Sequence, residues 1–345
     1  MNNIIKYLVL WVASDCNLKC KYCYAFPNFS HGKMKIEIAK KAIKACNNKN
    51  FTLIFAGGEP LLNFQLIEEV YDFLKQEGYN CKLGLQTNGT LITSEIAQKL
   101  KDMNINVGVS FDCSLQTNDF FRKSSKKVLE GVEKLREVGK IINLNSVLTS
   151  KSVVEMEKFI EMSYYFGNVG GVGIDLLRLS SYAMLDDDVK LPNDEDIYIN
   201  LKKAYIKSKN LGKLFGKKVK IREIEELRYR KEKGHCSDGY CYSSLAQAIV
   251  VDVDGNIYPC SSLVGDKRYL CGNINEIDRV KIIALNSGKV ENCKSCKYQI
   301  YCKGCCPARM IYNTPYNKNQ DCVLRKAIFR ILEEEKNGEE NIVSF

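Results

Sequence analysis

The chain of 345 residues contains only two histidines and no long apolar run. Neither His31 nor His235 has a recognisable catalytic setting, so acid–base chemistry based on histidine is disfavoured. No stretch approaches the roughly 20 apolar residues that a membrane-spanning helix needs. The apolar run at residues 4–12 lacks a preceding basic segment and a small-residue cleavage site, so we expect neither a signal peptide nor a membrane partner.

Cysteine, by contrast, is abundant, with 16 in the chain. In a protein without an export signal, such a number indicates a reducing compartment, where metal ligation is expected rather than disulfides. We therefore expect a cytoplasmic protein. The net charge of +10 is compatible with a nucleic-acid partner, but Lys and Glu alternate along most helical segments, as on a solvated surface. We expect no nucleic-acid partner.

Strand and helix patterns alternate along the first half of the chain. Short β-branched or aromatic runs predict strands at Ile4–Val12, Phe51–Phe55, Lys82–Gln86, Asn106–Phe111, Ile141–Val147 and Val172–Leu177. Amphipathic stretches predict helices at Ile36–Ala45, Phe64–Gln76, Ser94–Lys101, Lys126–Val138 and Val153–Phe166. Ser152 and Glu155 are expected to form a capping box for the last helix. Repeated βα units predict an α/β fold with a parallel sheet.

Composition divides the chain into four parts. We expect a first domain over residues 1–185, a charged helical bridge over 186–234, a cysteine-rich domain over 235–330 and a charged tail over 331–345. In the cysteine-rich part, the segment AIVVDVDGNIYPC predicts two strands joined by a two-residue hairpin turn at Asp254 and Gly255.

The most specific motif is the CxxxCxxC spacing of Cys16, Cys20 and Cys23, directly after the first predicted strand. Three thiolates in one loop suit three irons of a 4Fe-4S cluster and leave the fourth iron open to a small molecule. A zinc knuckle or three core cysteines are the alternatives. Structural zinc takes four ligands, and His31 is the only candidate nearby for the fourth. A loop after a strand also lies at the carboxyl end of a barrel-like sheet, where such folds carry their chemistry.

At this point the chain resembles the radical SAM superfamily, whose CxxxCxxC loop binds a 4Fe-4S cluster that chelates S-adenosylmethionine (SAM). Further motifs follow in the family's order, with FAGGEP at residues 55–60, QTNGT at 86–90 and VSFD at 109–112. The resemblance implies a partial (β/α)6 TIM-like barrel. It also implies reductive cleavage of SAM to a 5'-deoxyadenosyl radical that abstracts a hydrogen atom from the substrate.

The resemblance further implies which residues contact SAM. Backbone carbonyls of the GGEP segment and the Glu59 carboxylate would receive the ammonium of SAM, since paired glycines allow close approach. Arg122 would pair with a carboxylate, because the segment from Asn118 is similar to the family's HDxxR, with Asn in place of His. Tyr22 would pack beside the adenine, with ordinary loop packing as the alternative. The expected contacts are Tyr22, Gly57, Gly58, Glu59, Pro60, Thr87, Asn88, Ser110, Asp112 and Arg122.

A second block of cysteines follows residue 235. Its spacing resembles the SPASM domain, which holds two auxiliary 4Fe-4S clusters and would bring the total to three. The resemblance implies one ligand set of Cys236, Cys241, Cys260 and Cys306 and another of Cys293, Cys296, Cys302 and Cys322. Cys305 is adjacent to Cys306 and could exchange roles with it. A pair of zinc ribbons is the alternative.

Apart from Cys305, four cysteines lie outside these sets, namely Cys46, Cys81, Cys113 and Cys271. Cys46 and Cys81 fall within or beside regular elements and are expected to be small buried hydrophobes. Cys113 follows Asp112 at the expected barrel mouth, where the family often has glycine. It is therefore a candidate for a radical-quenching or substrate-facing thiol. Asp112 and Cys113 are our candidates for a catalytic role.

SPASM enzymes mostly modify peptides or proteins, so the resemblance implies such a substrate and a flavodoxin- or ferredoxin-type electron donor. We expect a peptide maturase that forms a thioether or other crosslink in a ribosomally made peptide. An anaerobic sulfatase-maturating, formylglycine-forming enzyme is the alternative, but its catalytic Asp follows a cysteine that corresponds to Cys260, and Ser261 stands there. A non-catalytic iron–sulfur electron-transfer protein is the second alternative. Because the barrel begins close to Met1, leader recognition is expected elsewhere or in a separate leader-peptide-binding protein.

Overall fold

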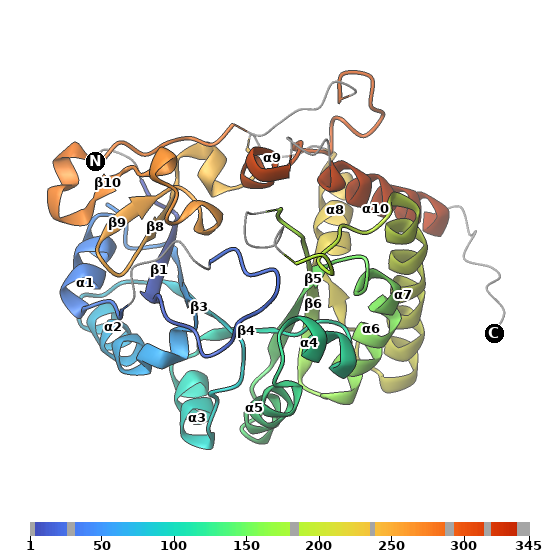
Figure 1. The fold of residues 1–345 in the computed structure, drawn as a ribbon, viewed down its shortest axis with the longest axis horizontal. Coiled ribbons are helices and arrows are strands. Elements are labelled where there is room, and N and C mark those ends of the chain that lie inside the picture. Colours follow the sequence, from blue (N-terminus) through green and yellow to red (C-terminus); the bar gives the residue numbers. More distant parts are fainter. Residues whose placement is uncertain are drawn as a thin grey trace.

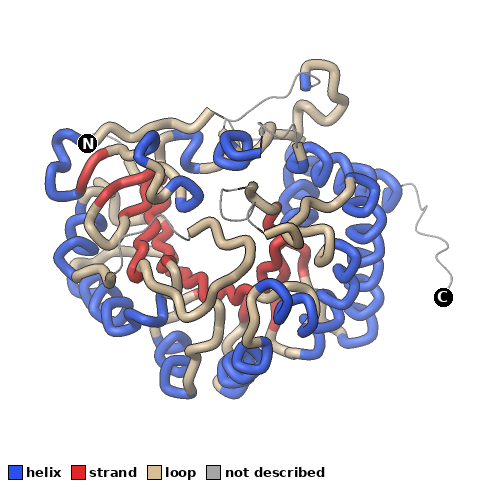
Figure 2. The backbone as a smooth tube through the Cα atoms, in the orientation of Figure 1, coloured by secondary structure: helices blue, strands red, loops and turns tan. Residues whose placement is uncertain are grey.

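The protein is represented by a computed structural model that describes residues 4–25, 32–179, 186–234, 239–286, 293–313 and 319–336. Its centre is one ten-stranded sheet with the strand order β10-β9-β8-β1-β2-β3-β4-β5-β6-β7. The sheet curves around a central space and carries helices on its outer face (Figures 1 and 2). This is the partial barrel of α/β type that the sequence predicts.

Seven consecutive parallel strands form most of the barrel wall. They are Tyr7–Ala13 (β1), Thr52–Gly57 (β2), Lys82–Thr87 (β3), Asn106–Ser110 (β4), Ile142–Leu148 (β5), Val169–Leu176 (β6) and Lys220–Ile221 (β7). The six predicted strands are present, with ends shifted by a few residues. In β1, Leu8 and Leu10 belong to the main core, whereas Val9 and Trp11 face the barrel interior, as the two-residue period of a strand requires.

The outer helices occupy the predicted places. They are Ile36–Lys44 (α1), Phe64–Gln76 (α2), Ser94–Asp102 (α3), Ser125–Glu137 (α5) and Met156–Tyr165 (α6). The short helix α4, Leu115–Phe121, was not predicted. Short 3-10 turns are found at Pro60–Asn63, Val153–Glu155, Tyr242–Leu245, Ser261–Leu263, Lys267–Tyr269 and Ile274–Arg279. None of the described helices is long and apolar enough to cross a membrane.

The predicted capping box is wrong. Helix α6 begins at Met156 without a side-chain cap. The Ser152 hydroxyl instead accepts a hydrogen bond from the Thr149 N–H (2.8 Å) and donates one to the Val147 carbonyl (2.7 Å). Glu155 accepts hydrogen bonds from side chains of α4 and its N-cap. Ser side chains often bond to nearby backbone in this way, in competition with capping.

The expected helical bridge is also part of the barrel wall. It contains α7, Asp194–Phe215, and α8, Arg222–Lys233, and between them β7 extends the sheet beside β6. The C-terminal helix α10, Gln320–Lys336, packs against both α7 and α8. The domain boundary at residue 185 therefore stays a prediction, since the sheet continues across it.

The cysteine-rich part joins the same sheet. Strand β8, Ala248–Val251, pairs parallel with β1, and β9, Asn256–Tyr258, pairs antiparallel with β8. Strand β10, Gly272–Asn273, follows β9, and helix α9 covers Pro307–Asn313. The Asp252 N–H donates to the Asn256 carbonyl (3.0 Å), so the turn has three residues, not the predicted two. Gly255 supplies the positive φ, 85°, that this longer turn needs.

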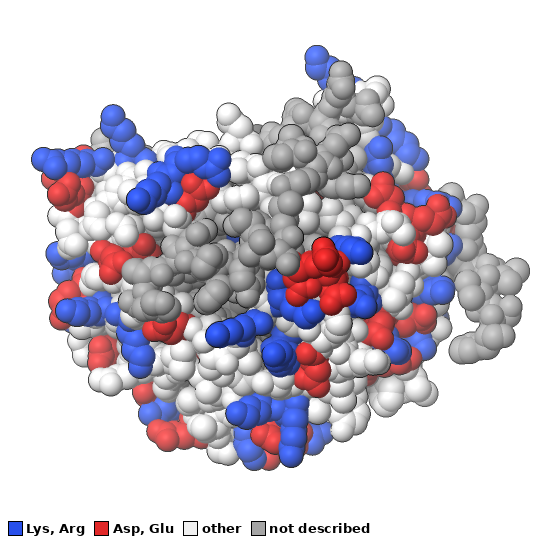
Figure 3. Space-filling model, in the orientation of Figure 1, with Lys and Arg blue, Asp and Glu red and all other residues white. Residues whose placement is uncertain are grey.

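Positive and negative side chains intermingle over the described part of the face in Figure 3. Many of them form pairs along one helix, such as Lys134 with Glu137 and Arg136 with Glu133. This is the solvated surface that alternating Lys and Glu predict.

Candidate active site

The loop that follows β1 lies inside the open barrel (Figure 2). A cavity of about 860 Å³ extends from this loop across the barrel interior to the cysteine-rich part. Cys16, Cys20 and Cys23 all line it, and so do Ser261 and Ser262 of the C-terminal part. The three thiols of the CxxxCxxC motif therefore share one cavity with residues far along the chain.

The FAGGEP segment fixes the start of the cysteine loop. The Gly58 N–H donates to the Ala13 carbonyl (2.8 Å), and the Glu59 N–H donates to the Asp15 carbonyl (2.9 Å). A Cβ on Gly57 would lie 2.2 Å from the Ala13 oxygen, and one on Gly58 would lie 2.4 Å from the Asp15 oxygen. A side chain at either glycine would therefore displace the loop, because neither neighbour is a movable side chain.

Glu59 is buried behind the cavity wall. Its carboxylate accepts hydrogen bonds from the Thr87 hydroxyl (2.6 Å) and from the N–H groups of Asn88 (2.8 Å) and Leu61 (3.1 Å). Burial raises the pKa of Glu59, and these bonds oppose the rise. Gly57 and Gly58 line the cavity, whereas Glu59 and Pro60 are absent from its lining. The carboxylate thus ties FAGGEP to QTNGT, and its contact with SAM stays a prediction.

The QTNGT segment supports the cysteine loop from the other side. Thr87 and Asn88 line the cavity. The Asn88 side-chain nitrogen donates to the Asn17 oxygen (2.9 Å) and lies 3.8 Å from the Cys16 sulfur. The Asn88 oxygen accepts a hydrogen bond from the Thr90 hydroxyl (2.7 Å). Asn88 is therefore held in one orientation beside the first cysteine.

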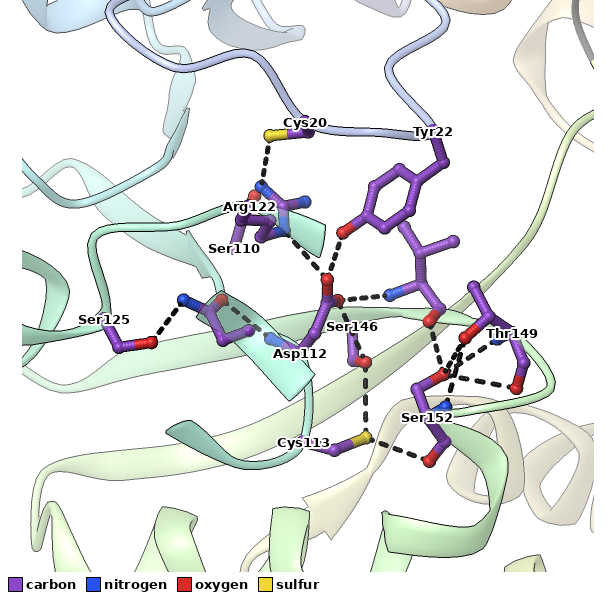
Figure 4. A network of polar contacts seen from close by, with 12 residues as sticks. Cys20, Tyr22, Ser110, Asp112, Cys113, Arg122, Ser125, Ser146, Thr149 and Ser152 are labelled. Carbon is purple, nitrogen blue, oxygen red and sulfur yellow. Dashed lines mark hydrogen bonds and ion pairs between the residues drawn. The ribbon is translucent and has the colours of Figure 1, made fainter. Parts of the chain in front are cut away.

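A buried polar network centres on Asp112 (Figure 4). Its carboxylate is fully buried and accepts hydrogen bonds from the Tyr22 hydroxyl, the Val147 N–H (3.0 Å) and the Ser146 hydroxyl (3.2 Å). Tyr22 and Ser110 line the cavity, but Asp112 does not. Asp112 therefore anchors Tyr22, and its contact with SAM stays a prediction.

Arg122 pairs with a carboxylate of the protein itself, and its predicted contact with SAM stays a prediction. Its Nε lies 3.3 Å from an oxygen of Asp112. A terminal nitrogen of the same guanidinium lies 3.9 Å from the Cys20 sulfur, and its carbon lies 5.4 Å from the centre of the Tyr22 ring. A fixed positive charge next to the loop thiols suits an anionic iron–sulfur cluster.

Cys113 does not have the position expected of a substrate-facing thiol. It is 1% exposed and is absent from the cavity lining. Its sulfur lies 3.4 Å from both the Ser146 hydroxyl and the Ser152 carbonyl, behind Asp112 (Figure 4). Burial raises the pKa of the thiol. A radical-quenching or substrate-facing role for Cys113 stays a prediction. Its φ of 54° is left-handed, a conformation that glycine adopts freely.

A ladder of polar side chains across the barrel interior was not predicted. The Gln86 amide donates to Ser110 (2.9 Å), the Asn145 amide donates to Gln86 (3.0 Å), and Arg222 donates to Asn145 (3.0 Å). Arg222 also pairs with Asp175 at 3.1 Å. All five residues line the cavity.

Two glycines make room for this ladder. A Cβ on Gly108 would lie 2.6 Å from the Gln86 oxygen, and one on Gly173 would lie 2.4 Å from the Asn145 oxygen. Both glycines stand inside predicted strands, where glycine is unfavourable unless another group approaches closely. These glycines within strands are the sequence signal of the ladder. They do not identify which side chains form it.

The C-terminal cysteines separate into two groups. A small cavity is lined by Cys293, Cys296, Cys302, Cys305 and Cys322. Cys260 and Cys306 instead pack against one apolar cluster, and the Cys241 thiol is near enough to affect the pKa of Cys260. The neighbours Cys305 and Cys306 thus face different groups. Cys236 lies outside the described residues, and both ligand sets stay predictions.

The donor sets fit iron–sulfur clusters. Both groups and the N-terminal loop offer cysteine sulfur alone, which is the ligand type of these clusters. Among the described residues, no three His, Cys, Asp or Glu side chains converge closely enough to hold a single metal ion. The cysteine sulfur of each group is the ligand type that a four-iron cube takes.

Comparison with known proteins decides the family. A model of the radical SAM superfamily matches residues 12–162, which include the three loop cysteines and all the predicted SAM contacts. The chain belongs to the radical SAM superfamily. Membership implies a 4Fe-4S cluster and SAM, and it establishes that the protein is a radical SAM enzyme.

Three curated relatives align over most of the chain. The uncharacterized protein MJ0907 of Methanocaldococcus jannaschii is 32% identical over 82% of this chain and 93% of its own length. The cysteine-type anaerobic sulfatase-maturating enzyme of Clostridium novyi is 26% identical over 94% of both chains. The radical SAM cyclopropyl synthase TigE of Paramaledivibacter caminithermalis is 26% identical over 96% of this chain and 75% of its own. The radical SAM enzyme is thus related to sulfatase maturases and to peptide modifiers.

Solved structures agree with this relationship. The structure of anSMEcpe with bound AdoMet and Cp18Cys peptide has a TM-score of 0.77 at 25% identity and covers 97% of this chain and 99% of its own. Streptococcus suis SuiB bound to the precursor peptide SuiA has a TM-score of 0.64 at 15% identity, over 89% and 73% of the two chains, and supports the fold alone. The resemblance to radical SAM enzymes with a SPASM domain is thereby confirmed.

Proposed function

We propose that this radical SAM enzyme is a peptide maturase that forms a thioether or other crosslink in a ribosomally made peptide. The observation that carries the proposal is the cavity of about 860 Å³, which is lined both by Cys23 and Tyr24 of the cysteine loop and by Ser261 and Ser262 of the cysteine-rich part. A peptide segment in this cavity would lie between the SAM site and the cysteine-rich part. The structure of anSMEcpe, which contains a bound peptide, supports this class of substrate.

The residues around the loop suit the roles that such an enzyme needs. When bound, a 4Fe-4S cluster on Cys16, Cys20 and Cys23 together with SAM supplies a 5'-deoxyadenosyl radical that takes a hydrogen atom from the substrate. Gly57 and Gly58 let the cavity wall pack closely against the cysteine loop, and both would contact the methionine part of SAM. Thr87, Asn88 and Ser110 offer hydroxyl and amide groups along the wall. Tyr22 and Arg122, both fixed by Asp112, hold their orientation beside the cluster loop.

Formation of a thioether removes a hydrogen atom from a C–H bond, a proton from a thiol and one electron from the substrate. We propose that two auxiliary 4Fe-4S clusters, held by the ligand sets predicted above, supply the acceptor for that electron. A flavodoxin- or ferredoxin-type protein would reduce the first cluster. Leader recognition would come from another part of this chain or from a separate leader-peptide-binding protein.

Sulfatase maturation is the second candidate, and the long alignment with the Clostridium novyi enzyme favours it. Against it, Ser261 follows Cys260 and lines the cavity where that reaction would need a carboxylate base. Asp175 is a carboxylate on the same wall, but it is paired with Arg222 at 3.1 Å. The guanidinium of Arg222 occupies this carboxylate, so Asp175 is a poor substitute for a free base.

The test is anaerobic incubation of the reconstituted enzyme with reductant, SAM and short cysteine-containing peptides, followed by mass spectrometry. A crosslinked product keeps its sulfur and loses two hydrogen atoms, whereas formylglycine formation removes the sulfur. A pure electron-transfer protein would give no 5'-deoxyadenosine. The variant Cys20→Ala, which lacks one loop thiol, should give neither 5'-deoxyadenosine nor product.

A further inference from the structure

One arginine of the cavity differs from the others in its partners. Four arginines line the cavity. Three of them form ion pairs at 2.6 to 3.3 Å: Arg122 with Asp112, Arg222 with Asp175 and Arg309 with Asp321. The fourth, Arg178, has no carboxylate within ion-pair distance among the described residues.

Arg178 is nevertheless held firmly. It is 8% exposed, and its guanidinium carbon lies 4.0 Å from the centre of the Tyr24 ring and 4.8 Å from that of Tyr312. One terminal nitrogen donates to the Ser262 carbonyl, and Nε has no hydrogen-bond partner in the described structure. The side chain is thus fixed between two rings without full use of its donors.

A buried guanidinium without a counter-charge is costly to the protein. Two aromatic faces and one carbonyl offset only part of the lost hydration. The other three arginines show how the cavity compensates this cost, through carboxylates of the chain itself. No described carboxylate plays this part for Arg178, whose ionisable neighbours are the Tyr24 and Tyr312 hydroxyls and the thiols of Cys23 and Cys260. A carboxylate partner for Arg178 therefore has to come from a bound molecule.

The place of Arg178 narrows the identity of that anion. Two residues anchor the Arg178 side chain. Tyr24 comes directly after Cys23, and Ser262 comes two residues after Cys260. An anion bound there would lie between the SAM-binding loop and the auxiliary site, where a substrate has to be held. The planar fork of a guanidinium pairs best with a carboxylate or phosphate, and a peptide brings carboxylates.

We propose that Arg178 binds a carboxylate of the peptide substrate, either an acidic side chain or the C-terminus. The proposal rests on the proposed function, in which the substrate is a peptide. Tyr24 and Tyr312 fix the plane of the guanidinium before the substrate arrives. Arg178 therefore selects which part of the peptide faces the SAM site.

The probe is a set of four pools of random cysteine-containing peptides without other acidic residues, each with an uncharged fluorophore. The pools carry Asp or Asn at one fixed position and have a free or amidated C-terminus. Binding to the reconstituted, SAM-loaded enzyme is measured by fluorescence anisotropy. The neutral pool is the one with Asn and an amidated C-terminus. We expect a pool with a carboxylate to bind roughly tenfold tighter than this neutral pool. Preference for the Asp pool identifies a side chain, and preference for the free-acid pool identifies the C-terminus.

The variant Arg178→Gln should lose this preference while keeping its iron and its SAM cleavage without peptide. The matched control Arg279→Gln removes the same charge from an exposed arginine paired with Glu276 and should keep the preference. If Arg178→Gln loses its iron, the variant Arg178→Lys tests the proposal instead, because lysine keeps the positive charge but lacks the planar guanidinium fork. That variant should show a clearly smaller preference than the wild type.

Equal binding of all pools by the wild type, or an undiminished preference in Arg178→Gln or Arg178→Lys, would overturn the proposal. Arg178 would then only balance the charge of the cluster thiolates. An enzyme that modifies peptides but ignores their carboxylates refutes this inference and leaves the proposed function intact. An enzyme that neither binds nor modifies any pool refutes both.

Discussion

Arg325 brings a guanidinium nitrogen to within 3.3 Å of the Cys302 sulfur and also donates to the Gly304 carbonyl. Its carbon lies 4.8 Å from the centre of the Tyr240 ring, which helps to fix the side chain. Hydrogen bonds and positive charge at a cluster sulfur raise the reduction potential, because they stabilise the reduced, more negative cluster. For the auxiliary cluster proposed at Cys302, we therefore predict that Arg325→Met lowers the reduction potential by about 60 mV, one factor of ten for a one-electron couple.

The measurement for Arg325→Met is a redox titration followed by electron paramagnetic resonance. Arg330 is the control, because it lies on the same helix and pairs with Glu334 at 3.0 Å at the surface. The variant Arg330→Met should leave all potentials unchanged. A full complement of clusters with unshifted potentials in Arg325→Met would refute the role of Arg325.

Gly58 tests the packing of the cysteine loop against FAGGEP. A methyl group at this position would lie 2.4 Å from the Asp15 carbonyl oxygen and would push the loop away. We predict that Gly58→Ala slows SAM cleavage by about a hundredfold, as a displacement of about 1 Å in a positioned group can do. The assay measures 5'-deoxyadenosine without peptide. Gly78→Ala is the control, because it also strains the backbone, at a φ of 67°, but its methyl group meets no atom within 4 Å and Gly78 does not line the cavity. Near-normal cleavage in Gly58→Ala would contradict the steric argument.

The sequence predicts well which segments reach the cavity. It predicts less well which side chains of those segments line it. Gly57, Gly58 and Asn88 line it as expected, because each motif ends a parallel strand and those ends meet at one edge of the sheet. Glu59 and Asp112 come from the same motifs but lie behind the wall. That difference depends on the backbone path just after each strand, which no motif spacing specifies.

At the scale of the elements, the Glu335 side chain links the C-terminal helix α10 to the two helices of the expected bridge, α7 and α8. Its carboxylate accepts hydrogen bonds from the Tyr205 hydroxyl (2.6 Å), Arg228 (2.8 Å) and Lys209 (3.1 Å). Burial raises the pKa of Glu335, but these bonds outweigh it and lower the pKa from 4.5 to about 2. Glu335 thus connects α10 to both α7 and α8.

A depressed carboxylate pKa contributes stability above the unfolded pKa, and that contribution is lost as the pH falls from 4.5 towards 2. We predict that Glu335→Gln lowers the free energy of unfolding by about 1 kcal/mol at pH 7, allowing for the partial exposure of the group. The difference should stay constant between about pH 8 and 5 and shrink only below that range. Urea unfolding at several pH values measures it, and a difference that fades between pH 8 and 5 would exclude Glu335 as its source.

Elements with strong periodic patterns were predicted well, and short ones were not. Helix α2 was predicted with its observed bounds, Phe64–Gln76, because its apolar residues follow one face for several turns. Strand β7, Lys220–Ile221, is too short for any period to identify and exists through its pairing with β6. The hairpin turn was one residue longer than predicted because the Asp252 side chain bonds to the N–H groups of Asp254 and Asn256 (3.0 and 2.8 Å), which stabilises the wider turn.

At the scale of the whole molecule, the cysteine-rich part and the barrel share one sheet. Strand β8 pairs with β1, and Val250 and Tyr258 pack with Val9 and Trp11 in one apolar cluster. The strand that precedes the cysteine loop is therefore central, with β2 on one side and β8 on the other. This continuity fixes the auxiliary site relative to the SAM site, which an electron-accepting role would require.

We therefore predict that a chain ending at residue 234 does not fold into a stable barrel. Its β1 would become an edge strand with unpaired backbone groups, and the apolar side chains of Val9 and Trp11 would lose their cover. Expression should give insoluble protein, whereas a control chain ending at Lys336, the last residue of α10, should stay soluble and bind iron. A soluble, monomeric product from the shorter chain that binds a cluster and cleaves SAM would show that the barrel is an independent domain, and the shared sheet would then be a contact between two domains rather than one folding unit.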